Sequence, residues 1–382
     1  MMKILIAPNA FKNSLHADEV ADALLAGLKK SGLEAEYTLL PVGDGGDGTG
    51  PLLIRALNGR SVGSLATDPL GRKIKTSFGF VEESRTAIIE LAGISGLRLL
   101  KPEEYDPLHA STYGLGEQIR QALDMGSKKI ILGIGGSATA DAGCGLAKAL
   151  GLRFIDGAGK EFDPLPANLP ELADIDLDKL DPRIFDTEII VLCDVRNFLL
   201  GEKGAAKFFG KQKGASDADI EYLENAILHL TAVIRKKTGQ DPNAFPHGGA
   251  AGGTAAGLKI FLHAQLVEGI EFFLDTIHAD SVLENTGLLI TGEGRIDSQT
   301  LEGKAPWGIA RRAKKKNIPV IGIAGEIDED PELKNYFDKL ISINDPSSPV
   351  QLSMKQTPVN LLRAGEEIGR QLKGSQGDPL KL

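Results

Sequence analysis

The sequence predicts an α/β protein in which a discontinuous, doubly wound parallel-sheet domain carries a second α/β domain as an insertion. Three observations support this prediction. Strand-length apolar runs alternate with helical periodicity at both ends of the chain. Polar, glycine-rich turns follow several of these runs. The length of 382 residues exceeds what one hydrophobic core usually covers. We expect residues 1–60 and 267–382 to form the first domain and residues 61–266 the second, with a ligand site in the cleft between them.

The two ends of the chain predict the doubly wound domain. Residues 17–30 place Val20, Leu24 and Leu28 at helical spacing. The strands predicted in this domain are residues 3–7, 36–42, 287–291, 319–324 and 339–344, and the helices are residues 17–30, 49–57, 306–316 and 359–372. These elements form βα units of one sheet.

The middle of the chain follows a different pattern. Short extended segments separated by turns predict a small antiparallel sheet, followed by further α/β elements. The strands predicted here are residues 62–67, 73–81 and 86–91, one at residue 129, and residues 188–193. The helices are residues 112–125, a helix that follows the glycine-rich turn through residues 148–150, and residues 217–237. Residues 162–186 are rich in proline and aspartate, which predicts an exposed excursion.

Composition limits the function classes. Lys and Arg number 43 against 52 Asp and Glu, a net charge of −9 that argues against a nucleic-acid partner. No signal region or apolar stretch of membrane-spanning length stands out, so we expect a cytoplasmic protein without a membrane partner. Cys144 and Cys193 lack ligand spacing and are expected to be small, buried, reduced residues. The six histidines show no metal spacing, which argues against zinc.

Residues 130–145 pass from a strand pattern into a glycine-rich turn and then into small helix-forming residues. Gly135 and Gly136 let the backbone approach a ligand, and Ser137 or Thr139 could cap the following helix. Free amides in such a turn attract phosphate or carboxylate. A tight turn that needs small residues only for packing is an equally open interpretation.

Four further polar turns follow predicted strands. They are residues 9–14, 43–49, 194–197 and 292–303. Each would lie at the carboxyl end of its strand, where open α/β sheets bind ligands. One shared enzyme site explains this recurrence better than structural repetition does.

The motifs in these turns resemble those of one family. The segments concerned are Ala7–Leu15, Pro41–Thr49, Asp68–Arg72, Ser111–Gly114, Gly133–Gly145, Cys193–Arg196, Lys211–Ala215 and Thr291–Asp297. Together they look like the motif series of bacterial glycerate kinases of the two-domain type with a flavodoxin- or Rossmann-like domain, in the same order along the whole chain. Asn9, Asp47 and Ala140 depart from the residues the resemblance leads us to expect, which are Asp, Glu and Asn.

The resemblance implies a transferase that moves the γ-phosphoryl group of ATP to a hydroxyl of D-glycerate with the help of Mg²⁺. The product would be a phosphoglycerate, with 2-phosphoglycerate favoured over 3-phosphoglycerate. The sequence leaves the choice between the C2 and C3 hydroxyls, and the oligomeric state, open.

The residues offer candidates for each role that phosphoryl transfer needs. Asp194, at a strand end, is our first choice for the base, and an Asx turn is the alternative. Lys12 and Arg196 are further candidates for catalytic residues. Lys12 suits a phosphate and Ser14 a phosphate or the substrate, with a solvated lysine and a capping serine as alternatives. Arg72 and Arg196 suit the carboxylate of glycerate, unless they form surface salt bridges.

The remaining candidates are acidic or belong to the glycine-rich turn. Asp44 is a candidate for substrate binding. Two glycines follow it in the sequence and separate it from Asp47. Glu293 and Asp297 are candidates for Mg²⁺, although Asp297 could instead cap a turn. The candidates for nucleotide phosphate are Gly135, Gly136, Ser137 and Thr139.

Two other classes of function fit the sequence less well. A dinucleotide-dependent oxidoreductase should open its first βαβ unit with G-x-G-x-x-G, whereas residues 8–12 read Pro-Asn-Ala-Phe-Lys. A non-catalytic sensor of small anions or nucleotides would keep the glycine turns but would not need Asp44, Asp194 and Asp297 together.

Overall fold

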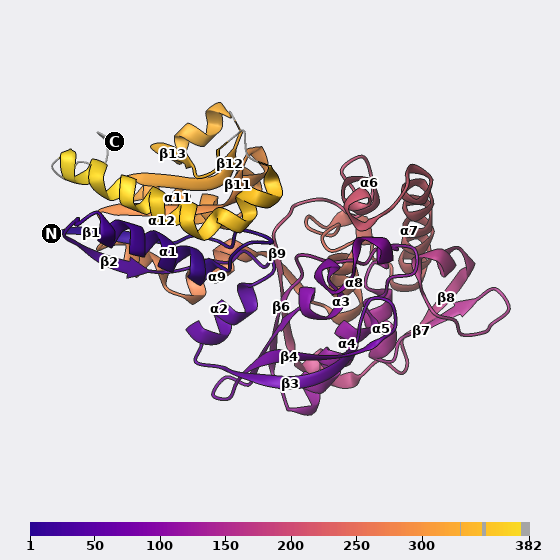
Figure 1. Cartoon of the computed structure of the whole chain (residues 1–382). Coiled ribbons are helices and arrows are strands. Elements are labelled where there is room, and N and C mark those ends of the chain that lie inside the picture. Colours follow the sequence, from indigo (N-terminus) through magenta and orange to yellow (C-terminus); the bar gives the residue numbers. More distant parts are fainter. Residues whose placement is uncertain (329, 346–348, 376–382) are drawn as a thin grey trace. The chain divides into compact units, whose positions relative to one another are not determined.

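The structure is a computed structural model that describes residues 1–328, 330–345 and 349–375. The chain divides into two compact α/β units, Met1–Asp44 with Ile270–Leu382, and Gly45–Gly269 (Figure 1). The predicted α/β class, with one discontinuous unit and one inserted unit, is confirmed. The division places residues 45–60 with the inserted unit, whereas we expected them in the first domain, because α2 (Thr49–Ala56) packs on β4 (Lys73–Val81) and β5 (Thr86–Glu90).

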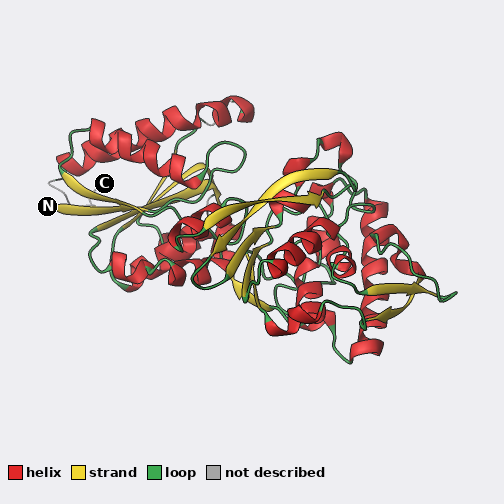
Figure 2. Ribbon diagram, turned by 90° about the horizontal axis from the view of Figure 1, so that it is seen from below, coloured by secondary structure: helices red, strands yellow, loops and turns green. Residues whose placement is uncertain are grey.

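The first unit is built on a five-stranded parallel sheet of order β13-β12-β11-β1-β2. Its strands are β1 (Met2–Ile6), β2 (Ala35–Leu39), β11 (Leu288–Ile296), β12 (Val320–Ile327) and β13 (Lys339–Ser342). Numbered by their order along this unit, the strands run 5-4-3-1-2, the doubly wound flavodoxin-like arrangement. Its helices, found on both faces of the sheet in Figure 2, are α1 (Ala17–Lys30), α9 (Gly269–Thr276), α10 (Ala279–Leu283), α11 (Ala305–Lys315) and α12 (Val350–Gly374).

The second unit contains a six-stranded sheet of order β10-β9-β6-β5-β4-β3 and a two-stranded sheet. Its strands are β3 (Arg60–Thr67), β4, β5, β6 (Lys129–Gly133), β7 (Arg153–Asp156), β8 (Leu172–Asp176), β9 (Glu188–Cys193) and β10 (Gln265–Glu268). Its helices are α2, α3 (Ala92–Ser95), α4 (Tyr113–Asp124), α5 (Cys144–Ala149), α6 (Ala205–Phe209), α7 (Asp217–Thr238) and α8 (Thr254–Leu262). Strands β5, β6, β9 and β10 are parallel, so their carboxyl ends share one edge.

The predicted periodicities account for most elements. Val20, Leu24 and Leu28 of α1 are buried, as their spacing predicted. A capping box between His16 and Glu19 begins the same helix. Strand β11 continues to Ile296, beyond the predicted end, because it pairs with β12 past the point where β1 ends.

One prediction for the second unit is wrong, and one of its segments has no predicted element. Residues 162–186 are not an exposed excursion: Leu172 and Ile175 of β8, with Ile184, reach the hydrophobic core, and β8 pairs with β7. Residues 254–268 hold α8 and β10, which we did not predict. In both places the apolar residues have strand or helix spacing but lie among prolines, aspartates and glycines. These residues disfavour regular structure locally, and the packing of the apolar side chains in the tertiary structure outweighs that preference.

Helix α12 begins nine residues before the predicted start at residue 359 and contains Pro358. Proline has no amide hydrogen, so the carbonyl of Met354, four residues earlier, loses its helical partner. The hydroxyl of Ser14 donates to this carbonyl at 2.8 Å. A side chain from the other end of the chain thus satisfies the carbonyl that proline leaves open, and the helix continues through Pro358.

Helices α1 and α12 approach each other closely through two glycines. A Cβ on Gly27 would lie 2.1 Å from the carbonyl oxygen of Leu362, and one on Gly365 would lie 2.5 Å from that of Leu24. Both contacts are far shorter than van der Waals distance and involve backbone atoms, which cannot move aside easily.

We therefore expect Gly27→Ala to destabilise the first unit by about 2 kcal/mol, in the range for overpacked sites. A fall of several degrees in the melting temperature of that unit, followed by calorimetry, would show this. The control is Gly374→Ala, at a helical glycine with no atom within 4 Å of a new Cβ, where we expect no loss of stability. Equal melting temperatures for both variants would contradict the close-packing interpretation.

Candidate active site

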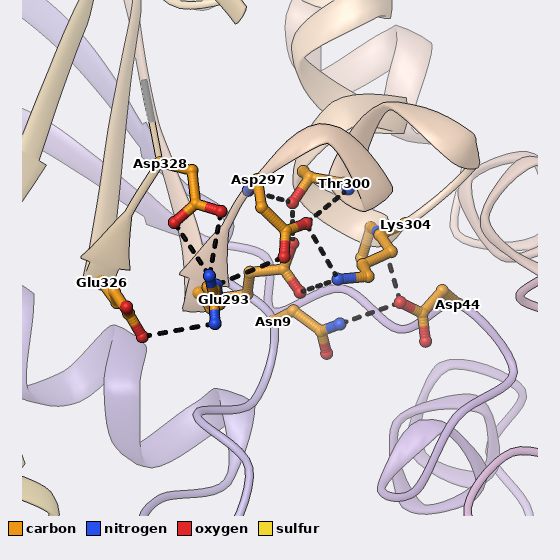
Figure 3. A network of polar contacts seen from close by, with 10 residues as sticks. Asn9, Asp44, Glu293, Asp297, Thr300, Lys304, Glu326 and Asp328 are labelled. Carbon is orange, nitrogen blue, oxygen red and sulfur yellow. Dashed lines mark hydrogen bonds and ion pairs between the residues drawn. The ribbon is translucent and has the colours of Figure 1, made fainter. Parts of the chain in front are cut away.

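The topological switch point of the first unit lies between β1 and β11, whose chain connections leave in opposite directions. Asn9 follows β1, Asp44 follows β2, and Glu293 lies in the part of β11 that extends past β1. Three turns that the sequence placed at strand ends therefore do meet at one edge of the sheet. Figure 3 shows the polar network that they form with residues 297–304.

Glu293 is at the centre of this network and is 6% exposed. Thr300 Oγ1 donates to Glu293 Oε1 at 2.8 Å. The ammonium of Lys304 lies 3.9 Å from Glu293 Oε2 and 3.7 Å from Asp297 Oδ1, so one lysine lies beside two carboxylates (Figure 3). Lys304 is the residue immediately before α11 and is its N-cap.

Burial raises the pKa of the Glu293 carboxyl to about 7. Lys304, the hydrogen bond from Thr300 and Lys12 oppose this shift, whereas the charge of Asp44 adds to it. Near neutral pH this carboxyl is therefore poised between its two protonation states.

Asp44 is buried and accepts two hydrogen bonds within the same unit. Asn9 Nδ2 donates to Asp44 Oδ2 at 3.0 Å, and the amide of Ala305, the first residue of α11, donates to the same oxygen at 3.2 Å. Asparagine at position 9 departs from the expected aspartate. Its amide supplies a donor to Asp44, where a second carboxylate would repel it.

A cleft of about 660 Å³ opens beside this network, within the first unit. It gathers the predicted residues Lys12, Ser14 and Glu293 and adds Lys304, which we did not predict. The hydroxyl hydrogen of Ser14 is engaged by Met354, so a ligand could use Ser14 only as an acceptor unless that bond breaks.

The second unit brings other candidates to the carboxyl edge of β6 and β9. Asp194 follows β9 directly. A Cβ on Gly135 would lie 3.4 Å from Asp194 Oδ2 and 2.6 Å from the Cα of Gly46. The amide of Gly135 donates to the carbonyl of Gly45 at 3.1 Å. Glycine at 135 is thus required by the close approach of Gly46, and the predicted base lies in ordinary contact distance of the same position.

The expected capping of α5 is wrong. Gly143, not Ser137 or Thr139, is the N-cap, and Asp141 supplies the anion at this helix start. Its carboxylate accepts from the amides of Gly143 and Gly145 at 3.1 Å and from Thr112 at 2.8 Å. Burial raises the pKa of Asp141, and these hydrogen bonds oppose the shift. The protein's own carboxylate therefore accepts from the backbone amides at the start of α5.

Much of the donor capacity of the glycine-rich turn is also engaged inside the protein. The amide of Ala138 donates to Ser95, and the buried ammonium of Lys213 donates to Ser137 Oγ at 2.8 Å and to the carbonyl of Thr139 at 2.6 Å. Burial lowers the pKa of Lys213 to about 7. The predicted phosphate role of Gly135, Gly136, Ser137 and Thr139 stays a prediction.

Both arginines proposed for the carboxylate of glycerate form ion pairs. Arg72 contacts Asp68 at 2.5 Å and Glu104 at 2.6 Å, and these carboxylates raise its pKa. Arg196 pairs with Glu268 at the end of β10. Both arginines thus form the salt bridges that we gave as the alternative to substrate binding. Either arginine would have to exchange its carboxylate partner for the substrate in order to bind it.

The predicted metal pair is close together but is bridged by a lysine. Asp297 also accepts from the amide of Thr300 at 3.1 Å, so its alternative role as a cap is confirmed. Across residues 1–328, 330–345 and 349–375, no group of three or more His, Cys, Asp or Glu side chains has the arrangement of a metal site. Glu293 and Asp297 could contribute one or two oxygen ligands but not a complete set.

Several residues of these sites escaped the sequence-based prediction. Lys304 and Thr300 lie inside the predicted turn 292–303 or next to it, but nothing in their spacing distinguishes them. Lys213 lies in the segment Lys211–Ala215, one of the motifs that resemble the family, and this resemblance is the feature of the sequence that could have identified it. Asp141 lies within the glycine-rich segment, and its burial depends on contacts with Thr112 that sequence spacing does not reveal.

Comparison with known proteins decides the family. The profile of the glycerate kinase family matches residues 4–373. The chain belongs to this family. It is 41% identical to a glycerate kinase of Bacillus subtilis, over 97% of this chain and 98% of that protein. It is 42% identical to a glycerate 2-kinase of Escherichia coli, again over 97% and 98%.

A solved structure agrees with the family assignment. The crystal structure of a candidate glycerate kinase 2 from Salmonella typhimurium LT2 matches with a TM-score of 0.82 at 41% identity, over 98% of this chain and 99% of that one. Membership of the glycerate kinase family makes this protein a kinase and argues against the alternative of a non-catalytic sensor. No helix in the described part of the chain is long and apolar enough to cross a membrane.

The raised pKa of Glu293 predicts a pH-dependent stability. Its ordinary value is 4.5, and in the fold it is about 7, so the folded protein holds one more proton than the unfolded chain between these values. The free energy of unfolding should therefore fall as the pH rises through this window, by on the order of 3 kcal/mol. Glu293→Gln should remove this contribution.

We expect Glu293→Gln to gain melting temperature relative to the unsubstituted protein as the pH rises from about 4.5 to about 7. Glu326→Gln, at a carboxylate that is 64% exposed on the adjacent strand, is the matched control and should show no such gain. Lys213 titrates in all three proteins and cancels in the comparison. A constant difference between Glu293→Gln and the unsubstituted protein across this range would contradict the assignment.

Proposed function

We propose that this protein phosphorylates D-glycerate with ATP and forms 2-phosphoglycerate. Membership of the glycerate kinase family supports the substrate class. The E. coli relative is named a glycerate 2-kinase, which supports the C2 hydroxyl as the acceptor. The proposed reaction forms a bond between the substrate oxygen and the γ-phosphorus, breaks the bond from that phosphorus to ADP, and releases the hydroxyl proton.

The observation that carries the proposal is the switch-point cluster of the first unit. Lys12 and Lys304 lie beside the buried carboxylate of Glu293 at a cleft of about 660 Å³. Phosphoryl transfer depends mainly on cations that stabilise the charge of the transferred group and on positioning. The two ammonium groups would bind phosphate oxygens, and Lys12 keeps its predicted catalytic role in this proposal.

Asp194 is the proposed base in the second unit. It follows the end of β9 and lies beside Gly135, where the turn of residues 43–49 packs closely. A carboxylate in this place would hold the attacking hydroxyl and accept its proton. Arg196, two residues further on, would bind the carboxylate of glycerate if it exchanged Glu268 for the substrate, and Arg72 is the second candidate.

Mg²⁺ is the proposed metal, and the first unit offers it a partial set of ligands. Glu293 and Asp297 provide carboxylate oxygens, the ligand type that Mg²⁺ prefers, and a cation beside Glu293 would favour its ionised form. Mg²⁺ in kinases typically takes one or two carboxylates and completes its shell with phosphates and water. When bound, it neutralises charge on the phosphates. Asp44 keeps its proposed role near the substrate.

The product test uses the purified full-length protein with ATP, Mg²⁺ and a panel of small hydroxy acids. We expect D-glycerate to be the preferred acceptor, and ³¹P–¹H NMR of the product should show the phosphate on the C2 oxygen. A phosphate on C3 would overturn the regiochemistry alone. Absence of any phosphorylated hydroxy acid would overturn the proposed function.

Asp194→Asn should lower kcat by two or more orders of magnitude, because a positioned base contributes on that scale. The fold should persist, since the amide has nearly the same shape. Asp186→Asn, at an exposed aspartate of the same unit, is the control and should keep its activity. Circular dichroism and steady-state kinetics on both variants suffice, and a kcat for Asp194→Asn within threefold of the control would remove Asp194 from the mechanism.

A further inference from the structure

We infer that the cleft of the first unit is the nucleotide site and that it takes a purine nucleoside triphosphate laid along the carboxyl edge of the parallel sheet. The inference rests on the proposed kinase function and adds the place where the phosphoryl donor binds. The volume of about 660 Å³ falls within the range of about 300–1,000 Å³ that is common for small-molecule sites.

The cleft runs across the ends of four adjacent strands. Its lining residues follow or end β1, β11, β12 and β13, which are neighbours in this order, and helix α12 adds to one wall. Adjacent strands lie about 4.8 Å apart, so the edge from β1 to β13 spans roughly 14 Å. This extent gives a base, a ribose and a phosphate chain separate places along one groove at the switch point of the sheet.

The end at β1 and β11 is cationic. Lys12 follows β1, and Lys304 caps α11, an eleven-residue helix whose positive end lies here. A helix start and two ammonium groups favour anions. The carboxylates of Glu293 and Asp297 beside Lys304 keep this end from being purely cationic, which suits phosphates that arrive with a divalent metal ion. The triphosphate therefore belongs at this end.

The end at β12 and β13 has a different character. Ile327 and Met354 supply apolar surface, and Ser342 and Asn344 supply neutral polar groups. Glu326 and Asp345 also line the cleft there, and carboxylates repel phosphate but accept hydrogen bonds from ribose hydroxyls. Apolar walls with a few polar groups are the usual surroundings of a base and its sugar.

The glycine-rich turn of the second unit is the competing location. Its Gly135 and Ala138 amides are bonded to carbonyl groups, Lys213 donates to Ser137, and the nearby helix α5 has six residues whose start is occupied by Asp141. The first unit offers an open cleft with two lysines instead. The open cleft and the start of an eleven-residue helix thus favour the first unit for the nucleotide, although Lys304 also lies beside Glu293 and Asp297.

The test of the base end uses Ile327→Trp in the full-length protein. The indole should fill the end of the cleft at β12 and β13 and weaken binding of a non-hydrolysable ATP analogue with Mg²⁺ at least tenfold, as measured by calorimetry. Leu352→Trp, at an exposed leucine of α12 that does not line the cleft, is the matched control and should bind within twofold of the unsubstituted protein. D-Glycerate affinity should be the same in both.

The test of the phosphate end uses Lys12→Met, with Lys29→Met in the last turn of α1 as control. Lys12→Met should weaken the ATP analogue at least fivefold but leave adenosine affinity unchanged, because adenosine carries no phosphate. Ile327→Trp should weaken both ligands. This pattern assigns the two ends of the cleft separately.

The outcomes also separate this inference from the proposed function. Unchanged nucleotide affinity in Ile327→Trp and Lys12→Met, together with a loss in Gly136→Val, would overturn the inference and place the nucleotide at the second unit's turn, even if the protein phosphorylates glycerate. Nucleotide binding that Ile327→Trp abolishes, in a protein that phosphorylates no hydroxy acid, would support the inference while the proposed function fails.

Discussion

The cost of burying the carboxylate of Glu293 is the constraint around which the first unit's site is arranged. A charge removed from water needs partners, and the fold supplies a hydroxyl from Thr300 and an ammonium from Lys304. Both come from the segment that connects β11 to α11. Helix α11 begins directly after this segment: Lys304 is its N-cap, and the amide of Ala305 donates to Asp44. A single buried charge thus couples a strand end, a turn and a helix start.

The second unit also buries ionisable side chains, but it surrounds them with different partners. Asp141 is buried against backbone amides and a threonine, and Lys213 is buried against a serine and a carbonyl. Each of these polar groups is hydrogen-bonded to neutral dipoles. Burial raises the pKa of Asp141 and lowers that of Lys213, and both shifts favour the uncharged form of the side chain. Glycines that admit no side chain let these turns come together, so much of the glycine-rich motif serves the packing of the turns.

The two units therefore offer complementary chemistry for a kinase. The first has cations and acidic oxygens beside an open cleft, which suits phosphates and a metal ion. The second has an aspartate at a strand end among close-packed glycines, which suits a small substrate with a hydroxyl group. Phosphoryl transfer requires little covalent chemistry from the protein and depends mainly on positioning, so turns of such different composition are compatible with the proposed reaction.

The sequence by itself determined the α/β class, the discontinuous first unit and the turns that carry Asp44, Asp194 and Glu293, because strand and helix periodicities and glycine turns are local signals. It also carried the family resemblance that the comparisons confirmed. It could not determine that Ser14 completes a helix interrupted by Pro358, that Asp141 accepts from the amides at the start of α5, or that Arg72 and Arg196 are paired. Ser14 with Met354, Arg196 with Glu268, Arg72 with Glu104 and Asp141 with Thr112 are contacts between residues distant in the chain, and only the tertiary structure decides which polar group meets which partner.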